Sequence, residues 1–276
     1  MTTRKHAESL LNRVGAADDD GFDLVEAALA LASLERPGVS LERYRDHLDL
    51  LAADVGRAAS DAGSLRDRVA ALNEVLFDTH GYEGDRRTYD DLQNANLMRV
   101  IDRRRGLPVA LGILALHAGR AQGWSIVGLK FPGHFLLRAE GAGERVILDP
   151  FDRGAERNSG ELRALLKAQG NEAAALRPEH YEAASDRDIL LRLQNNIKLR
   201  QTQRGDNHAA ARTMDVMLRI GPNETPLWHE KALLEAQLGR IDSAVAALEE
   251  YIARETRDGP RHDATLLLQK LRGQSG

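Results

Sequence analysis

The chain has 276 residues, of which 42% are hydrophobic and 29% are charged, and its formal net charge is −4 at pH 7. This composition supports a buried core and excludes a disordered or fibrous chain. The acidic balance and the low aromatic content of 4% argue against a nucleic-acid partner. The chain contains no cysteine, which excludes disulfides, thiolate metal sites and a cysteine nucleophile.

The N-terminal residues show no sign of a secretory signal, because no long apolar run precedes the acidic residues Asp18–Asp20. Uninterrupted apolar stretches such as Ala27–Ala32 are far shorter than the roughly 18 residues that a membrane-spanning helix needs. We therefore expect a cytoplasmic protein without a membrane partner.

Residues 1–80 are predicted to be a helical N-terminal segment. Within it, apolar residues recur at helical spacing in three stretches. The predicted helices cover Phe22–Leu34, Leu41–Ala59 and the segment that follows Ser64 and ends at Phe77. Ser40 is suited to cap the second helix, and the glycines within His80–Gly84 predict a loop.

Residues 81–180 are predicted to be a core of the α+β class. Asn94–Arg104 has the pattern of a short helix, and Val109–Gln122 that of a helix that is apolar on most faces and therefore buried. The elements predicted after it are strands at Ser125–Phe131, His134–Ala139 and Arg145–Leu148 and a helix at Gly160–Gly170. Glu140–Gly143 is predicted to be the hairpin turn between the second and third strands, which makes a small antiparallel sheet.

Residues 186–272 are predicted to be helical repeats. Six pairs of similar residues are 34 positions apart, which is the period of the tetratricopeptide repeat, a helix hairpin. The pairs are Gly205 and Gly239, Ala210 and Ala244, Met214 and Leu248, Met217 and Tyr251, Leu218 and Ile252, and Pro226 and Pro260. The glycines are expected at turns inside the hairpins, and Trp228 in the first helix of the second hairpin. These repeats either bind a protein or peptide on their concave face or, being so few, complete the fold.

His134 and Asp149 are the pair most suggestive of chemistry. His134 opens one predicted strand and Asp149 ends the next, so antiparallel pairing would bring both to the same end of the sheet. A carboxylate there holds an imidazole in one tautomer and stabilises its charged form, as in a nucleophile–histidine–aspartate triad. The structural alternative is that His134 is a turn residue and Asp149 caps the following segment.

Four motifs along the chain together point to a family. They are Asn94-Ala95-Asn96-Leu97, Arg104-Arg105-Gly106-Leu107-Pro108-Val109-Ala110-Leu111, Pro132-Gly133-His134-Phe135 and Leu148-Asp149-Pro150-Phe151. In this order they resemble the transglutaminase-like core of the SirB-type bacterial proteins, in which tetratricopeptide repeats also follow the core. The resemblance covers about residues 20–260 and implies a transglutaminase/papain-like fold, with a buried central helix on an antiparallel sheet.

The resemblance also implies roles for individual residues. In the wider superfamily a cysteine nucleophile starts the central helix, and a histidine and an aspartate follow on adjacent strands. By motif, His134 and Asp149 take the last two places, whereas the nucleophile place falls within Leu107–Ala110, where no residue is nucleophilic. Thioester chemistry is therefore excluded. The leading interpretation is a non-catalytic or regulatory module that binds a protein or peptide. The alternatives are an amide or ester hydrolase in which His134 and Asp149 activate water, and a repeat-based scaffold with an inert core.

Other candidate binding residues carry weaker signals. Asn94 and Asn96 fit the family motif and either bond to the backbone near the site or cap helices. The cluster Arg103–Arg105, with Arg104 in the motif, either receives a carboxylate or phosphate or is a solvated helix end. Trp228 is a further candidate. The histidines lack metal-ligand spacing, and no nucleotide-binding motif is present, so neither a metal nor a cofactor is expected.

Overall fold

The computed structural model describes residues 4–168 and 175–273. The chain divides into two compact units, one comprising residues 1–11 and 17–193 and the other residues 12–16 and 194–276. The boundary between the units falls inside helix α8 (Asp186–Gln203). The finer division predicted from the sequence, with segments 1–80, 81–180 and 186–272, stays a prediction.

The N-terminal part is helical, as predicted. Its helices are α1 (Arg4–Ala16), α2 (Leu24–Leu34), α3 (Glu42–Ala58) and α4 (Leu65–Asn73), and a π-helical turn at Glu74–Thr79 continues α4. Ser64 caps α4 in a reciprocal capping box with Asp67. The Ser40 hydroxyl accepts a bond from the Glu42 amide at 3.3 Å, so it satisfies one free donor at the start of α3. Helix α1 was not predicted, although its buried Ala7 and Leu11 are four residues apart.

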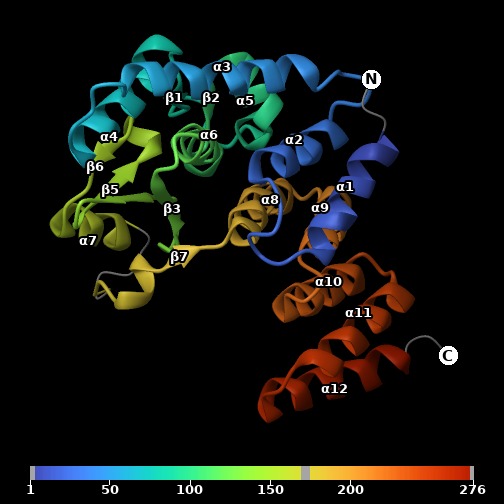
Figure 1. Ribbon diagram of the computed structural model, residues 1–276. Helices are drawn as coiled ribbons and strands as arrows, with labels where there is room; N and C mark the ends of the chain where they lie inside the picture. The colour runs from blue at the N-terminus through green and yellow to red at the C-terminus, as the bar shows by residue number, and fades with distance from the viewer. Residues whose placement is uncertain (1–3, 169–174, 274–276) are drawn as a thin grey trace. The chain divides into compact units, whose positions relative to one another are not determined.

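An antiparallel five-stranded sheet forms the centre of the first unit, which confirms the α+β class (Figure 1). Its strands are β3 (Ser125–Leu129), β4 (Leu137–Gly141), β5 (Glu144–Asp149), β6 (Ala155–Glu156) and β7 (Ala183–Ala184), in the order β6-β5-β4-β3-β7. A separate parallel pair joins β1 (Glu83–Gly84) to β2 (Arg105–Gly106). The loop predicted at His80–Gly84 is therefore wrong for its last two residues.

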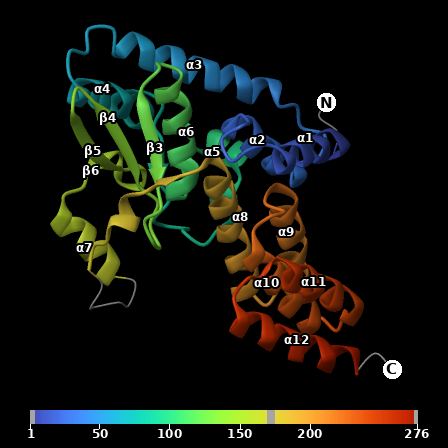
Figure 2. The same cartoon turned by 60° about the horizontal axis from the view of Figure 1, so that its bottom comes forward.

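The two faces of the large sheet are covered by helices. The central helix α6 (Pro108–Arg120) is buried on most sides and packs on β3, as Figure 2 shows. Helix α7 (Ser159–Lys167) places Leu162 and Leu166 in a separate cluster with Leu129 and Leu136. Because neighbouring residues of a strand face opposite ways, this cluster fills the other face. The predicted glycine stop of α7 at Gly170 lies outside the described residues.

The predicted helix Asn94–Arg104 is interrupted at Asn96. The chain forms a 3₁₀ turn at Leu92–Ala95 and then helix α5 (Leu97–Arg103). Asn96 has extended backbone angles, and its side chain accepts a bond from the Arg99 amide, so it caps α5 instead of continuing a helix through it. The physical reason is the strong tendency of asparagine to bond to nearby backbone amides.

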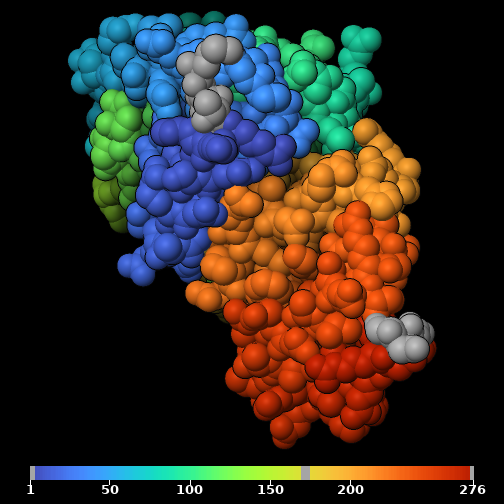
Figure 3. Space-filling view, turned by 90° about the vertical axis from the view of Figure 1, so that its right-hand side faces the viewer, coloured from blue at the N-terminus to red at the C-terminus, as the bar shows by residue number. Residues whose placement is uncertain are grey.

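The second unit is all helical. Its elements after α8 are α9 (Asn207–Ile220), α10 (Thr225–Gln237), α11 (Ile241–Arg254) and α12 (Asp258–Arg272), drawn in orange to red in Figure 3. Gly205 and Gly239 have left-handed φ values of 74° and 72° and form the turns predicted inside the hairpins. Ala244 and Leu248 of α11 are fully buried against α10 and α12. No helix in residues 4–168 or 175–273 is long and apolar enough to cross a membrane.

Candidate functional site

His134 and Asp149 lie at the same end of the sheet, at the open end of the β4–β5 hairpin, away from its turn. The two strands pair with Leu137 opposite Leu148, so Asp149 ends β5 beside the segment that leads into β4. His134 itself lies in a bend three residues before β4 begins, and the prediction that it opens the strand is therefore wrong. The bend starts at Pro132, which has no amide hydrogen to donate to a ladder.

The Asp149 carboxylate is buried and fully bonded. Its Oδ1 accepts from His134 Nε2 at 2.9 Å and from the Phe151 amide at 3.0 Å. Its Oδ2 accepts from Arg157 Nη2 at 3.0 Å. Burial raises the pKa of Asp149, but the bonds from His134 and Arg157 outweigh burial, so the net pKa is below the usual range. Asp149 is therefore ionised near neutral pH.

An ionised Asp149 defines the tautomer of His134. A carboxylate can only accept, so Nε2 of the imidazole carries the hydrogen. In the neutral ring, Nδ1 then holds the free lone pair. No described residue hydrogen-bonds to Nδ1, and the side chain is 17% exposed. His134 is thus oriented to accept a hydrogen bond or a proton through Nδ1.

Arg157 is a partner of this pair that sequence reasoning missed. It follows β6, which pairs with the end of β5 so that Ala155 lies opposite Asp149. The same guanidinium also donates to Asp152 at 2.6 Å. A tight turn at Arg153-Gly154, where both residues have positive φ, reverses the chain. The Asp-Arg-Gly sequence of that turn is the signal that could have predicted the hairpin and the return of Arg157.

The start of the central helix carries only hydrocarbon. Leu107 is the N-cap of α6 without a side-chain cap bond, and Pro108 is the first helical residue. All four residues of Leu107–Ala110 are buried. One turn further along α6, Gly112 receives the ring of Phe135, the neighbour of His134; a β-carbon on Gly112 would lie 2.3 Å from that ring. This close contact positions the His134 bend against the helix.

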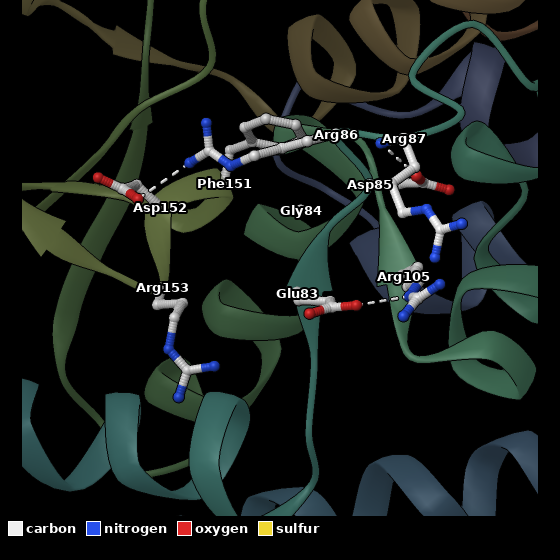
Figure 4. A pocket seen from close by; sticks show the side chains of 9 residues that line it. All are labelled: Glu83, Gly84, Asp85, Arg86, Arg87, Arg105, Phe151, Asp152 and Arg153. Atoms are coloured by element: carbon white, nitrogen blue, oxygen red, sulfur yellow. Dashed lines mark hydrogen bonds and ion pairs between the residues drawn. The ribbon is translucent and has the colours of Figure 1, made fainter.

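A pocket of about 240 Å³, drawn in Figure 4, is lined in part by the turn that begins at Asp149. We call it the arginine pocket. It is lined by Glu83, Gly84, Asp85, Arg86, Arg87, Arg105, Phe151, Asp152 and Arg153. Phe151 joins it to the pair: its amide bonds to Asp149, and its ring stands edge-on to the His134 ring, with 6.4 Å between the ring centroids.

Asn94 and Asn96 have structural contacts. The Asn94 amide donates to the Thr88 carbonyl at 2.6 Å and accepts from Arg103 at 2.9 Å. Asn96 caps α5 and donates to the Ala32 carbonyl at 3.0 Å. Both side chains are buried, so both hold backbone in place and neither is exposed to a partner. Their proposed role in binding stays a prediction.

The three arginines of the predicted basic cluster point to different partners. Arg103 pairs with the buried Asp85 at 3.0 Å. Arg104 has a left-handed φ of 59°, and its guanidinium donates to His47 at 2.6 Å and to Tyr82 at 2.5 Å. Burial, and next the Arg104 charge, lower the pKa of His47 to about 4. Arg105, unlike its neighbours, lines the arginine pocket.

Trp228 is part of the core of the second unit. It lies in α10, as predicted, and packs against the buried cluster of α10, α11 and α12. Its indole N–H donates to the Pro222 carbonyl at 2.9 Å, and Arg254 lies over its ring at 5.2 Å. These contacts support a structural role, and binding through Trp228 stays a prediction. Among the described side chains, no group of three or more His, Asp or Glu residues could hold a metal ion.

Comparison with known proteins agrees with this architecture. Residues 42–195 match the family model of the transglutaminase-like superfamily, and residues 197–271 match that of the tetratricopeptide repeat. The chain is 31% identical to a UPF0162 protein of Xylella fastidiosa over 249 residues, 88% of each chain. It is 30% identical to a UPF0162 protein of Vibrio cholerae over 236 residues, 85% of this chain and 87% of the relative. It is also 28% identical to F-box only protein 21 of Homo sapiens over 180 residues, 61% of this chain and 28% of that protein. The chain belongs to the SirB-type family of transglutaminase-like proteins, the UPF0162 family, in which tetratricopeptide repeats follow the core.

Proposed function

We propose that the transglutaminase-like core is a non-catalytic module that binds a protein or peptide next to His134. The observation that carries this proposal is the buried hydrocarbon of Leu107–Ala110 at the helix start. In the wider superfamily a cysteine nucleophile occupies that place, and this chain has no cysteine at any position. Without a nucleophile, a triad loses most of its rate enhancement, whereas its hydrogen-bonding groups keep their capacity to bind.

The geometry around His134 supports binding. The imidazole is fixed by Asp149 and presents an acceptor nitrogen, and the arginine pocket lies on the adjoining turn. A fixed polar group beside a pocket is the usual composition of a recognition site. The tetratricopeptide repeats are of a type that generally contacts other proteins, which favours a macromolecular partner over a small metabolite.

The first test selects peptides that bind the full chain. A library of random twelve-residue peptides is screened against the immobilised protein, and the dissociation constants of selected peptides are measured by fluorescence anisotropy. We expect His134→Gln to weaken binding about tenfold, the effect of losing a hydrogen bond to a fixed group. Leu233→Ser, a change at an exposed leucine of α10, is the matched control and should have no effect.

The results separate the proposal from a scaffold function. If Leu233→Ser abolishes binding and His134→Gln does not, the repeats bind and the core is inert. A library that yields no binder at all contradicts the proposal. Melting temperatures of both variants must match that of the wild type, so that loss of binding is not loss of folding.

A hydrolase is the second candidate, favoured by the oriented lone pair on His134 Nδ1. A general base can activate water without a protein nucleophile, a step that typically contributes a factor of about 10² to 10⁴. We expect no turnover of a capped peptide amide or of p-nitrophenyl acetate beyond that of a free imidazole. His262→Gln, at an exposed histidine of α12, controls for unspecific ester cleavage. Turnover that vanishes in His134→Gln and persists in His262→Gln would establish the hydrolase.

A further inference from the structure

Arg87 has a different environment from the other arginines of the arginine pocket. Those others pair with carboxylates: Arg86 with Asp152 at 3.0 Å, Arg105 with Glu83 at 2.5 Å, and Arg153 with Asp78. The Arg87 guanidinium has no carboxylate partner among residues 4–168 and 175–273, and the side chain is exposed. It therefore keeps five donors and a full charge for a ligand.

The carboxylate closest to Arg87 in sequence is fully occupied by other donors. Asp85 is buried and accepts from the Arg87 amide, from the amide and hydroxyl of Thr88, and from Arg103. Burial raises its pKa, but these hydrogen bonds outweigh burial and lower the pKa to about 2. Asp85 thus holds the loop by accepting from the Arg87 backbone amide, and it does not bind the Arg87 guanidinium, which lines the pocket.

The walls of the pocket are held by contacts between its own lining residues. Its floor is made where Phe151 packs on Gly84, so closely that a β-carbon on Gly84 would lie 2.5 Å from the Phe151 carbonyl. The Arg86 guanidinium lies over the Phe151 ring at 5.1 Å and closes one side. Figure 4 shows the Arg87 and Arg105 side chains together on the opposite side. Glu83 offsets the charge of Arg105, whereas no carboxylate among residues 4–168 and 175–273 offsets that of Arg87, so an anion on this side of the pocket gains the attraction of an unpaired charge.

The pocket and the His134–Asp149 pair share one turn. Phe151 and Asp152 line the pocket, and the turn Pro150–Asp152 begins at Asp149 itself. Arg157 joins the two by pairing with both Asp149 and Asp152. A group bound in the pocket therefore contacts the turn that begins at Asp149, the hydrogen-bond partner of His134.

We infer that the arginine pocket binds the carboxylate of an acidic side chain in a protein or peptide partner, with Arg87 as its principal donor and Arg105 as a second. The inference rests on the proposed function, because it names the chemistry of the ligand that the core binds. A carboxylate fits better than a phosphate, since Glu83 and Asp152 already line the pocket and repel a dianion more strongly than a monoanion.

The test uses the full chain and a defined probe, tetraglutamate with an acetylated N-terminus and an amidated C-terminus. Binding is followed by NMR at the arginine side-chain Nε–H signals. We expect saturable shifts at Arg87 and Arg105, and an affinity about tenfold lower in Arg87→Gln, as for the loss of a charge-assisted hydrogen bond. Arg145→Gln is the matched control, because Arg145 is an exposed arginine near the opposite end of β5 from Asp149.

Three results would overturn the inference. They are equal affinity of tetraglutamate for Arg87→Gln and the wild type, equal binding of a capped tetraglutamine, and tighter binding of inorganic phosphate than of tetraglutamate at the same ionic strength. The exposed position of Arg87 keeps the variant folded, which an unchanged melting temperature verifies.

The inference and the proposed function fail in different ways. Library peptides that bind next to His134 but contain no acidic residue would overturn the acidic ligand and leave the binding module standing. Tetraglutamate that binds at Arg87 while the library yields no binder would support the carboxylate site and contradict the proposed function.

Discussion

The pair His134–Asp149 has a close counterpart in the first unit, the pair His80–Asp54. Nε2 of His80 lies 2.7 Å from Asp54, compared with 2.9 Å in the first pair, and the second carboxylate oxygen bonds to an arginine in both. The surroundings differ. Asp149 is buried at the end of a strand and starts the turn that lines the arginine pocket, whereas Asp54 lies on helix α3. A short imidazole–carboxylate distance is thus not enough to define a site; the adjoining pocket makes the difference.

Removing each carboxylate should separate the two pairs most clearly. Asp149→Ala leaves His134 Nε2 and the Phe151 amide without this acceptor in a buried environment and removes one of the two carboxylates that Arg157 contacts most closely, and we expect a loss of about 3 kcal/mol in the free energy of unfolding. Asp54→Ala should cost about 1 kcal/mol, because Asp54 is 17% exposed, compared with 3% for Asp149, and its partner Arg57 is 70% exposed. Urea denaturation at pH 7 measures both, and equal losses would mean that the two environments are equivalent.

The contact between Phe135 and α6 should affect only the His134 pair. Gly112→Ala drives a β-carbon into the Phe135 ring, and we expect a loss of about 2 kcal/mol together with shifted NMR signals of His134. Gly119→Ala in the same helix is the control, since its β-carbon meets the Ile126 side chain at 3.1 Å and needs only a small adjustment. Unshifted His134 signals in Gly112→Ala would show that the helix does not position the bend.

The free energy of unfolding should depend on pH in different ranges near the two pairs, through His47 beside His80 and through Asp149. His47, whose ring lies 5.4 Å from that of His80, has its pKa lowered from 6.5 to about 4, so the unfolded chain binds a proton that the folded chain does not. Stability should therefore fall as the pH drops from about 6.5 to 4, by about 1.5 kcal/mol, less than the full shift implies because the ring is partly accessible to water.

The His47→Gln variant should lose this pH dependence. Asp149 contributes to stability because its pKa is lower in the folded chain than in the unfolded chain. This contribution is present above about pH 4 and is lost only as the pH falls further. Urea midpoints measured from pH 7 to pH 3 test both ranges. A wild-type profile that is flat between pH 6.5 and 4 would contradict the role of His47.

The tautomer of His134 should depend on Asp149, and NMR can detect this directly, without a measurement of stability. At pH 8.5 we expect ¹⁵N chemical shifts that report hydrogen on Nε2 and a free lone pair on Nδ1. In Asp149→Ala this preference should disappear, while the shifts of His80 stay the same. Hydrogen on Nδ1 in the wild type would contradict the orientation of the ring toward Asp149.

The parts of the fold that the sequence predicted are those with long-range regularity. The 34-residue offset located the turns at Gly205 and Gly239, and antiparallel pairing of two predicted strands brought His134 and Asp149 to one end of the sheet. The strand predicted to begin at His134 begins at Leu137, because Phe135 and Leu136, which extend the apolar run, are both buried and show no alternation. Phe135 packs on α6 before the ladder begins, so its burial follows from tertiary contacts that no local pattern shows.

The arginine pocket could not be predicted from the sequence. Its lining comes from residues 83–87, Arg105 and residues 151–153, which are far apart along the chain. The first two are joined by the parallel pair of β1 and β2, and two-residue strands are too short for hydrophobic alternation to reveal. The roles of Arg103, Arg104 and Arg105 could not be predicted either. Their partners Asp85, His47 and Glu83 lie 18, 57 and 22 positions away along the chain.

A single carboxylate both holds an imidazole and starts the turn that forms a pocket wall. Oδ1 of Asp149 bonds to His134 and to the Phe151 amide at once, so a rotation of that carboxyl group moves both. A ligand that displaces the Pro150–Asp152 turn is therefore expected to shift the ring of His134 as well. A substitution at Asp149 affects both together, whereas His134→Gln changes only the ring and Arg87→Gln only the pocket.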